Sequence, residues 1–224
     1  MRTKALLTAA ALAAGALSSM AQSNVYSLNI VGYVNAPLQG NGHLDLISDP
    51  FIPQNGNYDI TNTTALPNSY DGANLYYWGG TGWNNNVPGW ISGFGWFPDA
   101  VITLGNAFFI QAPAGAPPTN VTFVGQVATG NITNTFPTGL NVPANMTPVT
   151  GPWPGGTVGH DGDSIYLWTG SAWNNTVWGY IGGYGWFGTG AVGESTNGPV
   201  VNIATGVVYQ NTGAAITWVQ SFNP

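Results

Sequence analysis

The chain has no cysteine and very little charge. Its 224 residues include two basic and eight acidic residues and no Cys. The absence of Cys excludes disulfides, thiolate metal sites and a lipid anchor attached through an N-terminal Cys. The scarcity of charge excludes salt bridges as a main source of stability. Burial of apolar side chains and neutral hydrogen bonds must therefore hold the fold together.

Both basic residues belong to one N-terminal pattern. Arg2 and Lys4 precede an apolar run from Ala5 to Leu17 and a small-residue site that ends at Ala21. This pattern predicts a signal peptide over residues 1–21, so we expect a secreted protein, extracellular or at the cell surface, with the periplasm as an alternative. No later run is long enough for a transmembrane helix. The mature chain then has no Lys or Arg and a formal charge of −8, which makes nucleic acid a poor partner.

The rest of the sequence predicts an all-β fold. Short alternating or apolar runs recur between Gly, Pro, Asn and Asp residues, and helical periodicity is hard to find. The expected strands are Val25 to Val34, Leu44 to Ser48, Asn74 to Trp78, Ala107 to Gln111, Val121 to Val127, Ser164 to Trp168, Gly206 to Gln210 and Ile216 to Phe222.

A 28-residue block occurs twice in the chain. Residues 70–97 recur without a gap as residues 160–187, with 15 identities. Self-similarity at a fixed spacing indicates repeated structural units. We therefore predict two tandem sandwich- or barrel-like units of about 90 residues, over residues 22–127 and 128–224. The second copy carries nine extra residues after the block, including Glu194, the only Glu, and such an insertion fits a loop.

One strand type occurs three times, as Leu28 to Val34, Val121 to Val127 and Ile216 to Phe222. Three copies around two units suggest that the middle copy closes the first unit and opens the second. We therefore expect the two units to share this strand and to depend on each other structurally.

Several motifs resemble a family of small uncharacterised secreted proteins with tandem β repeats, of the kind found in Verrucomicrobia-type bacteria. They are Val25 to Asn35, Asp71-Gly72 before Leu75-Tyr76, Leu104 to Gln111, and Thr122 to Val127. The family's Pro-Gly before the Phe-Phe strand is Leu104-Gly105 here and is absent from the second copy. The resemblance implies export and a duplicated β architecture, and it implies no particular activity.

The repeated block suggests two interpretations of its aromatic residues. As one strand, Trp90 to Phe97 would place Trp90 and Trp96 on one face, and the second copy would place Tyr180 and Trp186 there. Exposed, these rings would stack on sugars, with Asn84 to Asn86, Asn174 and Asn175 as hydrogen-bonding partners. Buried, they would form the core. We favour burial, because large aromatic side chains usually serve packing.

Acidic residues suggest a metal site in the second unit. Asp161-Gly162-Asp163 follows His160 and offers the clustered oxygens that Ca²⁺ prefers. The first copy shares only the Asp-Gly dipeptide, which commonly forms a turn before a strand. We favour the turn, with Ca²⁺ as the only cofactor to consider.

The sequence offers no convincing catalytic group. His43 and His160 are unrelated between the copies, and no nucleophile motif accompanies either. Asp161, Asp163 and Glu194 have no spacing that suggests a carboxylate pair.

We therefore predict a non-enzymatic protein of the cell surface or extracellular matrix that acts in adhesion or self-assembly, by self-association of free strands such as Val25 to Val34. A module that binds a surface polysaccharide is the alternative. A glycan-active enzyme is the third class.

Overall fold

Seven strands form among the described residues of the first half of the chain. The computed structural model describes residues 30–153, 159–189 and 198–224, so the predicted signal peptide and Glu194 lie outside the described residues. The elements of the first half are β1 (Val31–Leu38), β2 (Leu44–Ser48), α2 (Ile60–Thr63), η1 (Asn68–Tyr70), β3 (Asn74–Tyr77), β4 (Gly89–Ile91), β5 (Gly95–Phe97), β6 (Ala107–Gln111) and β7 (Thr119–Gln126).

The second half contains nine described strands, and no helix longer than a turn lies among its described residues. They are β8 (Gly130–Phe136), β9 (Gly139–Asn141), β10 (Gly151–Pro152), β11 (Ser164–Tyr166), β12 (Trp178–Ile181), β13 (Gly185–Gly188), β14 (Val200–Val201), β15 (Val208–Asn211) and β16 (Ile216–Phe222). The fold is thus all-β, as predicted.

Each half contains one five-stranded antiparallel sheet. The order is β2-β6-β3-β4-β5 in the first half and β9-β15-β11-β12-β13 in the second. The register agrees too, because Leu75 lies opposite Ile110 while Ile165, 90 positions later, lies opposite Tyr209. The repeated sequence blocks therefore occupy the same places in two sheets of the same order.

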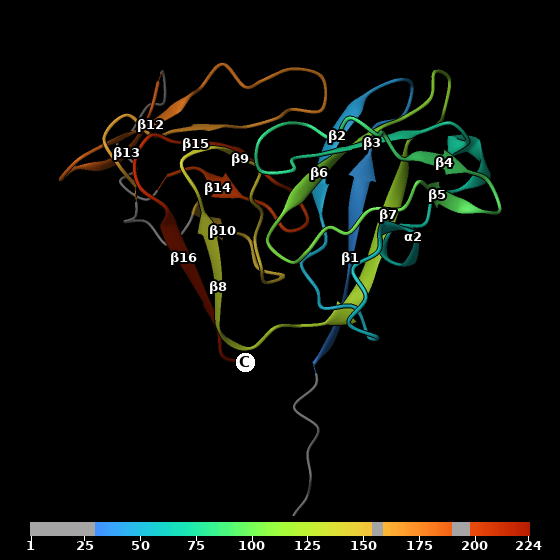
Figure 1. Cartoon of the computed structure of the whole chain (residues 1–224), viewed down its shortest axis with the longest axis horizontal. Coiled ribbons are helices and arrows are strands. Elements are labelled where there is room, and N and C mark those ends of the chain that lie inside the picture. The colour runs from blue at the N-terminus through green and yellow to red at the C-terminus, as the bar shows by residue number, and fades with distance from the viewer. Residues whose placement is uncertain (1–29, 154–158, 190–197) are drawn as a thin grey trace, which may run out of the picture.

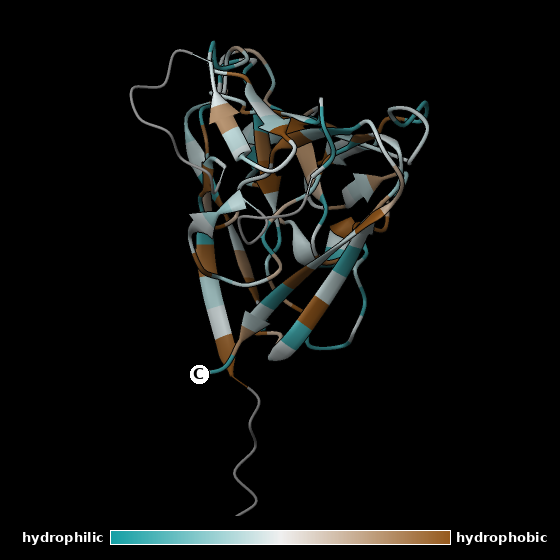
Figure 2. Ribbon diagram, turned by 90° about the vertical axis from the view of Figure 1, so that its left-hand side faces the viewer, coloured by the Kyte–Doolittle hydropathy of each residue, from teal (hydrophilic) through white to brown (hydrophobic). Residues whose placement is uncertain are grey.

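Each half also has a long two-stranded ribbon. β1 pairs with β7 along eight residues, and β8 pairs with β16 along seven. Both ribbons extend away from the sheets toward the same end of the molecule (Figure 1). Hydrophobic and hydrophilic residues alternate along the ribbon strands in Figure 2, which places one side on a core and the other toward solvent.

The prediction of a shared middle strand is wrong. Strand β7 pairs along its length with β1, and the second unit begins with its own strand β8. The sequence reasoning missed β8 because its outward positions hold Asn and Thr, which resemble loop residues. Its pairing with β16 supplies the second unit with a complete ribbon.

Three apolar clusters fill the interior. One packs largely within the first half around Phe51, Leu75 and Phe123, and one lies in the second half around Trp153 and Tyr209. The third joins the two halves and is described below. Among the described residues, no helix has the length and apolar character needed to cross a bilayer.

Candidate functional site

The repeated block folds as a hairpin and not as one strand. Strands β4 and β5 are antiparallel, with Trp90 directly opposite Trp96, and the turn lies between them at residues 92–94. Gly93 takes a positive φ of 77° there, which favours glycine. The second copy repeats the arrangement, with Tyr180 opposite Trp186. Trp90 and Trp96 still share a face, as expected for one strand, because they pair directly across the hairpin. The expectation fails for the turn, where Phe94 no longer lies on that face.

The residues predicted to stack on sugars lie mainly in the two cores. Trp96 is 2% exposed, and Trp90 and Trp186 are also buried. The Trp90 and Trp96 rings meet edge to face with centroids 5.6 Å apart, and half-buried Tyr180 packs on Trp186 at 5.3 Å. Stacking on a sugar needs an open ring face, so we correct the prediction for the three Trp residues. They are core residues, which is the interpretation favoured from the sequence.

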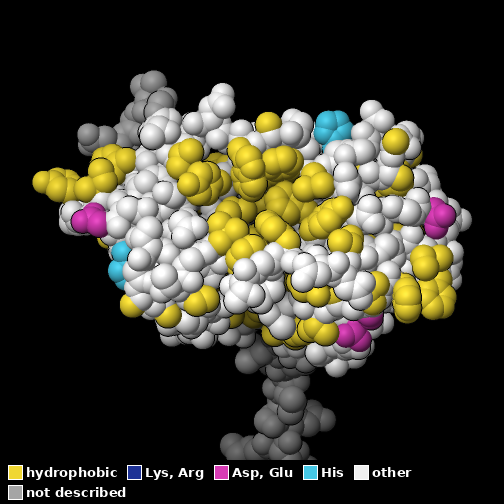
Figure 3. All heavy atoms as spheres, turned by 45° about the horizontal axis from the view of Figure 1, so that its top comes forward, with side chains coloured by type: hydrophobic (Ala, Val, Ile, Leu, Met, Phe, Trp, Pro, Cys, Tyr) yellow, Lys and Arg dark blue, Asp and Glu magenta, His cyan; other side chains and the backbone are white. Residues whose placement is uncertain are grey.

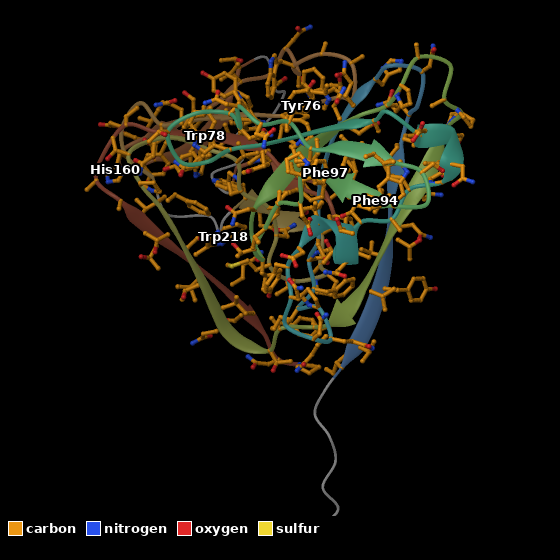
Figure 4. All side chains as sticks on the ribbon, turned by 45° about the vertical axis from the view of Figure 1, so that its right-hand side comes forward. Tyr76, Trp78, Phe94, Phe97, His160 and Trp218 are labelled. Atoms are coloured by element: carbon orange, nitrogen blue, oxygen red, sulfur yellow. The ribbon has the colours of Figure 1, made fainter. Side chains whose placement is uncertain are left out.

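The opposite side of each hairpin carries exposed apolar side chains. Ile91, Phe94 and Phe97 are exposed in the first half, and the Phe94 and Phe97 rings lie 6.4 Å apart (Figure 4). Tyr184 at the second hairpin tip is 70% exposed.

Asp163 has a structural role in the second core. Its buried carboxylate accepts hydrogen bonds from the His160 N–H at 2.8 Å, the Tyr209 hydroxyl at 2.5 Å, and the Thr212 N–H and hydroxyl at 2.7 and 2.8 Å. Burial alone would raise the pKa of Asp163, but the hydrogen bonds to its charged form outweigh burial and lower the pKa. Burial and the adjacent carboxylate raise the pKa of Tyr209.

Asp161 and Asp163, the residues considered for a Ca²⁺ site, both accept hydrogen bonds from within the protein. The oxygens of Asp163 already face four donors, whereas Ca²⁺ needs oxygens that are free to coordinate it. Asp161 accepts a hydrogen bond from the Gly182 N–H, as Asp71 does from the Ser92 N–H at 2.8 Å in the first copy. Within the described segments, no three His, Asp or Glu residues come together as a metal site. Both Asp-Gly dipeptides form turns.

A second set of repeated aromatic residues lies where the two halves meet. Trp78 bridges to Trp83 at the end of β3, and Trp168 bridges to Trp173 after β11. The ring centroids are 5.5 Å apart in the first pair and 4.9 Å in the second. Phe109 of β6 contacts both pairs, at 5.6 Å from Trp83 and 5.6 Å from Trp168.

We call this set the junction patch. Its members share ring contacts or the third apolar cluster: Tyr76, Trp78, Trp83, Phe109, Tyr166, Trp168 and Trp173. The sequence reasoning did not single out these residues. The signal was present, because both tryptophans of each W-x₄-W pair are identical in the two copies.

The junction patch reaches the surface. Trp83 is 37% exposed and Trp173 is 45% exposed, whereas Phe109 is buried beneath them. Figure 3 shows hydrophobic side chains gathered in the middle of one face, over the junction of the two halves, and Figure 4 places Tyr76 and Trp78 at the same end of the molecule. Contiguous exposed apolar surface of this kind usually marks a binding site.

Contacts between the halves hold the second Trp loop in place. The Trp168 indole N–H donates to the Leu44 carbonyl at 2.5 Å, and the Gln39 side-chain amide donates to the Thr169 carbonyl at 3.3 Å. The His43 ring nitrogen Nδ1 lies 3.4 Å from the Gly170 carbonyl. Both halves therefore position the junction patch.

The loops that carry the Trp pairs are polar but uncharged. Residues 78–87 and 168–177 contain no Asp, Glu, His, Lys or Arg. Asn85, Ser171 and Asn175 are exposed on these loops. Asn84, in contrast, accepts the Tyr77 N–H at 2.9 Å and donates to the Leu75 carbonyl at 3.3 Å. We correct the prediction that Asn84 binds sugar, because it holds its own loop together.

A pocket adjoins each Trp pair. One of about 280 Å³ is lined by Trp168, Asn174 and Asp45, and one of about 370 Å³ is lined by Trp78, Asn106 and Asn141. Asp45 and Asn141 occupy the same position in β2 and β9. Burial raises the pKa of Asp45 above its usual range despite the hydrogen bonds from Gln39 and the nearby His43.

Comparisons with protein-family models, curated proteins and solved structures find no match to this chain. The family resemblance expected from the motifs therefore stays a prediction. The junction patch is the feature that best fits a binding site.

Proposed function

We propose that this protein is a non-enzymatic protein of the cell surface or extracellular matrix that adheres by binding a neutral polysaccharide at the junction patch. The observation that supports it most is the pair of half-exposed tryptophans, Trp83 and Trp173, at equivalent places on the two halves. The predicted signal peptide supports the extracellular setting.

The chemistry of the patch favours a neutral sugar. A pyranose ring has an apolar face of C–H groups that packs on an indole, and its hydroxyls require neutral donors and acceptors. The Trp loops supply indole rings for the apolar face and neutral hydrogen-bonding groups for the hydroxyls. Exposed amide and hydroxyl side chains, such as Asn85, Ser171 and Asn175, lie on the same loops as the rings. The absence of cations from these loops disfavours a sulfated or uronic polymer.

The placement of the two Trp pairs favours a chain over a single sugar. Buried Phe109 contacts a ring of each pair, so the two pairs form one continuous aromatic surface. A polymer that crosses this surface contacts both pairs at once, and linked contacts increase the apparent affinity.

The test is binding to a panel of insoluble neutral polysaccharides. Trp83→Ala and Trp173→Ala should each reduce affinity about tenfold, equivalent to about 1.4 kcal/mol, and the double variant should lose measurable binding. Tyr184→Ala is the matched control, because Tyr184 is exposed but lies at a hairpin tip outside the patch. Equal binding by the double variant and the control would refute the proposal.

A further inference from the structure

The two ribbons differ on their outer faces although their strands occupy equivalent places. Tyr33 on β1 lies opposite Val124, and Thr133 on β8 lies opposite Val219. Tyr33 and Thr133 therefore occupy equivalent positions on the two ribbons. By the same register, Val31 on β1 is equivalent to Asn131 on β8. The second ribbon therefore presents mainly Asn, Thr and Ser to solvent, whereas the first presents Val31 and Tyr33.

The side chains on the first ribbon are well exposed. Tyr33 is 75% exposed, and Val31 and Val124 are more than half exposed. A ribbon that only faces water has no need of these residues, as the polar second ribbon shows. The difference between the copies points to a partner for the first ribbon.

The backbone of β1 has one unpaired edge. The Val127 N–H donates to the Ile30 carbonyl at 2.7 Å, so Ile30 and Val127 form a hydrogen-bonded pair. Antiparallel pairing alternates, which directs the N–H and C=O groups of Val31, Tyr33 and Asn35 away from β7. Within the described chain no other strand pairs with this edge of β1.

From these observations we propose that β1 is a homodimer interface, in which the outward edge of β1 pairs antiparallel with β1 of a second copy. The two ribbons then form one four-stranded sheet in the order β7-β1-β1-β7. This inference concerns a surface and a partner other than those of the proposed sugar site.

A second copy of the chain fits this edge better than a different protein. An antiparallel pair of identical strands is related by a two-fold axis, so each outward N–H of one copy meets an outward carbonyl of the other. Residues 30–38 contain no charged side chain, so the acidic molecules bring no like charges together here. Pro37, which lacks an N–H, limits the pairing toward the end of β1.

A two-fold interface also limits the assembly to two copies. Each copy contributes its single β1 edge, so the product is a dimer and not a fibre. Tyr76 and Trp78 of the junction patch lie toward the opposite end of the molecule from the end where the two ribbons meet (Figure 4), so a dimer would present two sugar sites.

Sedimentation of the purified protein over a range of concentrations tests the proposal. Wild type should sediment as a concentration-dependent monomer–dimer mixture, and Tyr33→Lys should remain monomeric because a solvated charge on the edge opposes strand pairing. Thr133→Lys is the matched control at the same place on the second ribbon, and it should dimerise like wild type.

Amide hydrogen exchange supplies a readout that needs no variant. The N–H groups of Val31, Tyr33 and Asn35 should exchange more slowly as the wild-type concentration rises, while the N–H of Thr133 should not change. A wild-type protein that stays monomeric at its solubility limit would overturn the proposal. A dimer that survives Tyr33→Lys, or whose formation leaves these three amides unprotected, would overturn it as well. Because sugar binding by the monomer requires none of this, a negative result here leaves the proposed function standing.

Discussion

The pKa values of two buried carboxyl groups are shifted in opposite directions. Asp163 has four hydrogen-bond donors, and its pKa is lowered. Asp49 accepts one hydrogen bond, from the Phe51 N–H at 2.9 Å, and burial raises its pKa to about 7. In the first unit, Ala73 and Ile110 stand at the positions of Asp163 and its partner Tyr209. The first core thus lacks both the carboxylate and the hydroxyl that binds it, so neither polar group is left without its partner.

Asp49 should make the protein less stable as the pH rises toward neutrality. The folded-state pKa of about 7 lies above the usual value of 3.8, so the folded state retains a proton that the unfolded chain releases. The stabilisation is full below the unfolded pKa and is lost as the pH rises through the folded pKa, with a total on the order of 4 kcal/mol. Asp49→Asn keeps the acceptor for the Phe51 N–H and removes the titration.

Chemical denaturation at a series of pH values measures this effect. Asp49→Asn should match wild type near about pH 4 and exceed its stability near about pH 8. Asp163 acts in the other direction, since its lowered pKa gives a contribution to stability that is lost as the pH falls below the usual pKa of an Asp carboxyl. Parallel stability curves for wild type and Asp49→Asn would contradict the role assigned to Asp49.

At the scale of elements, the sequence predicted strands where apolar alternation is strong. Residues 44–48, 107–111 and 216–222 are strands with the bounds expected from their patterns. Strand β8 was missed because Asn and Thr occupy its exposed face, and a single-sequence pattern does not separate such a strand from a polar loop. The β4–β5 hairpin was missed because glycines occur both in its turn and in its strands. Glycine therefore does not mark the position where the chain reverses direction.

The sequence analysis considered Trp90, Trp96 and Trp186 for sugar stacking, and these residues lie in the cores. Aromatic alternation is the same whether a ring faces the core or faces solvent. A sequence pattern therefore cannot distinguish buried Trp96 from half-exposed Trp83. What distinguishes them is the second sheet packed beside β6, and that arrangement depends on contacts between residues far apart in the chain.

Strand β6 connects the cores, because neighbouring residues point to opposite faces. Phe108 packs in the first core and Phe109 in the cluster between the halves. Phe109→Ala should destabilise the protein by about 3 to 5 kcal/mol and loosen the junction patch. Val208→Ala, at the equivalent position of β15, should cost less because it removes a smaller side chain.

Thermal unfolding followed by calorimetry and by Trp fluorescence checks this prediction. The Phe109→Ala protein should melt at a lower temperature and show weaker coupling between the two halves. Unchanged melting of the variant would show that the halves are held together without Phe109.

On the scale of the whole molecule, two similar sheets produce one surface that neither has alone. Phe109 from the first half lies beneath tryptophans of both halves, and the first half holds the second Trp loop through Leu44, Gln39 and His43. The repeat thus supplies matched Trp pairs, and their packing turns the pairs into a continuous patch. The proposed adhesion to a neutral polysaccharide rests on the location and chemistry of this patch.

The most direct test follows the indole N–H signals of the Trp side chains by nuclear magnetic resonance during titration with a soluble neutral oligosaccharide. The account predicts that the signals of Trp83 and Trp173 shift in a saturable manner, while those of the buried Trp96, Trp153, Trp186 and Trp218 stay in place. Shifts confined to the buried residues, or no shift with any neutral oligosaccharide that represents the polymers tested, would contradict the assignment of the junction patch as a sugar-binding site.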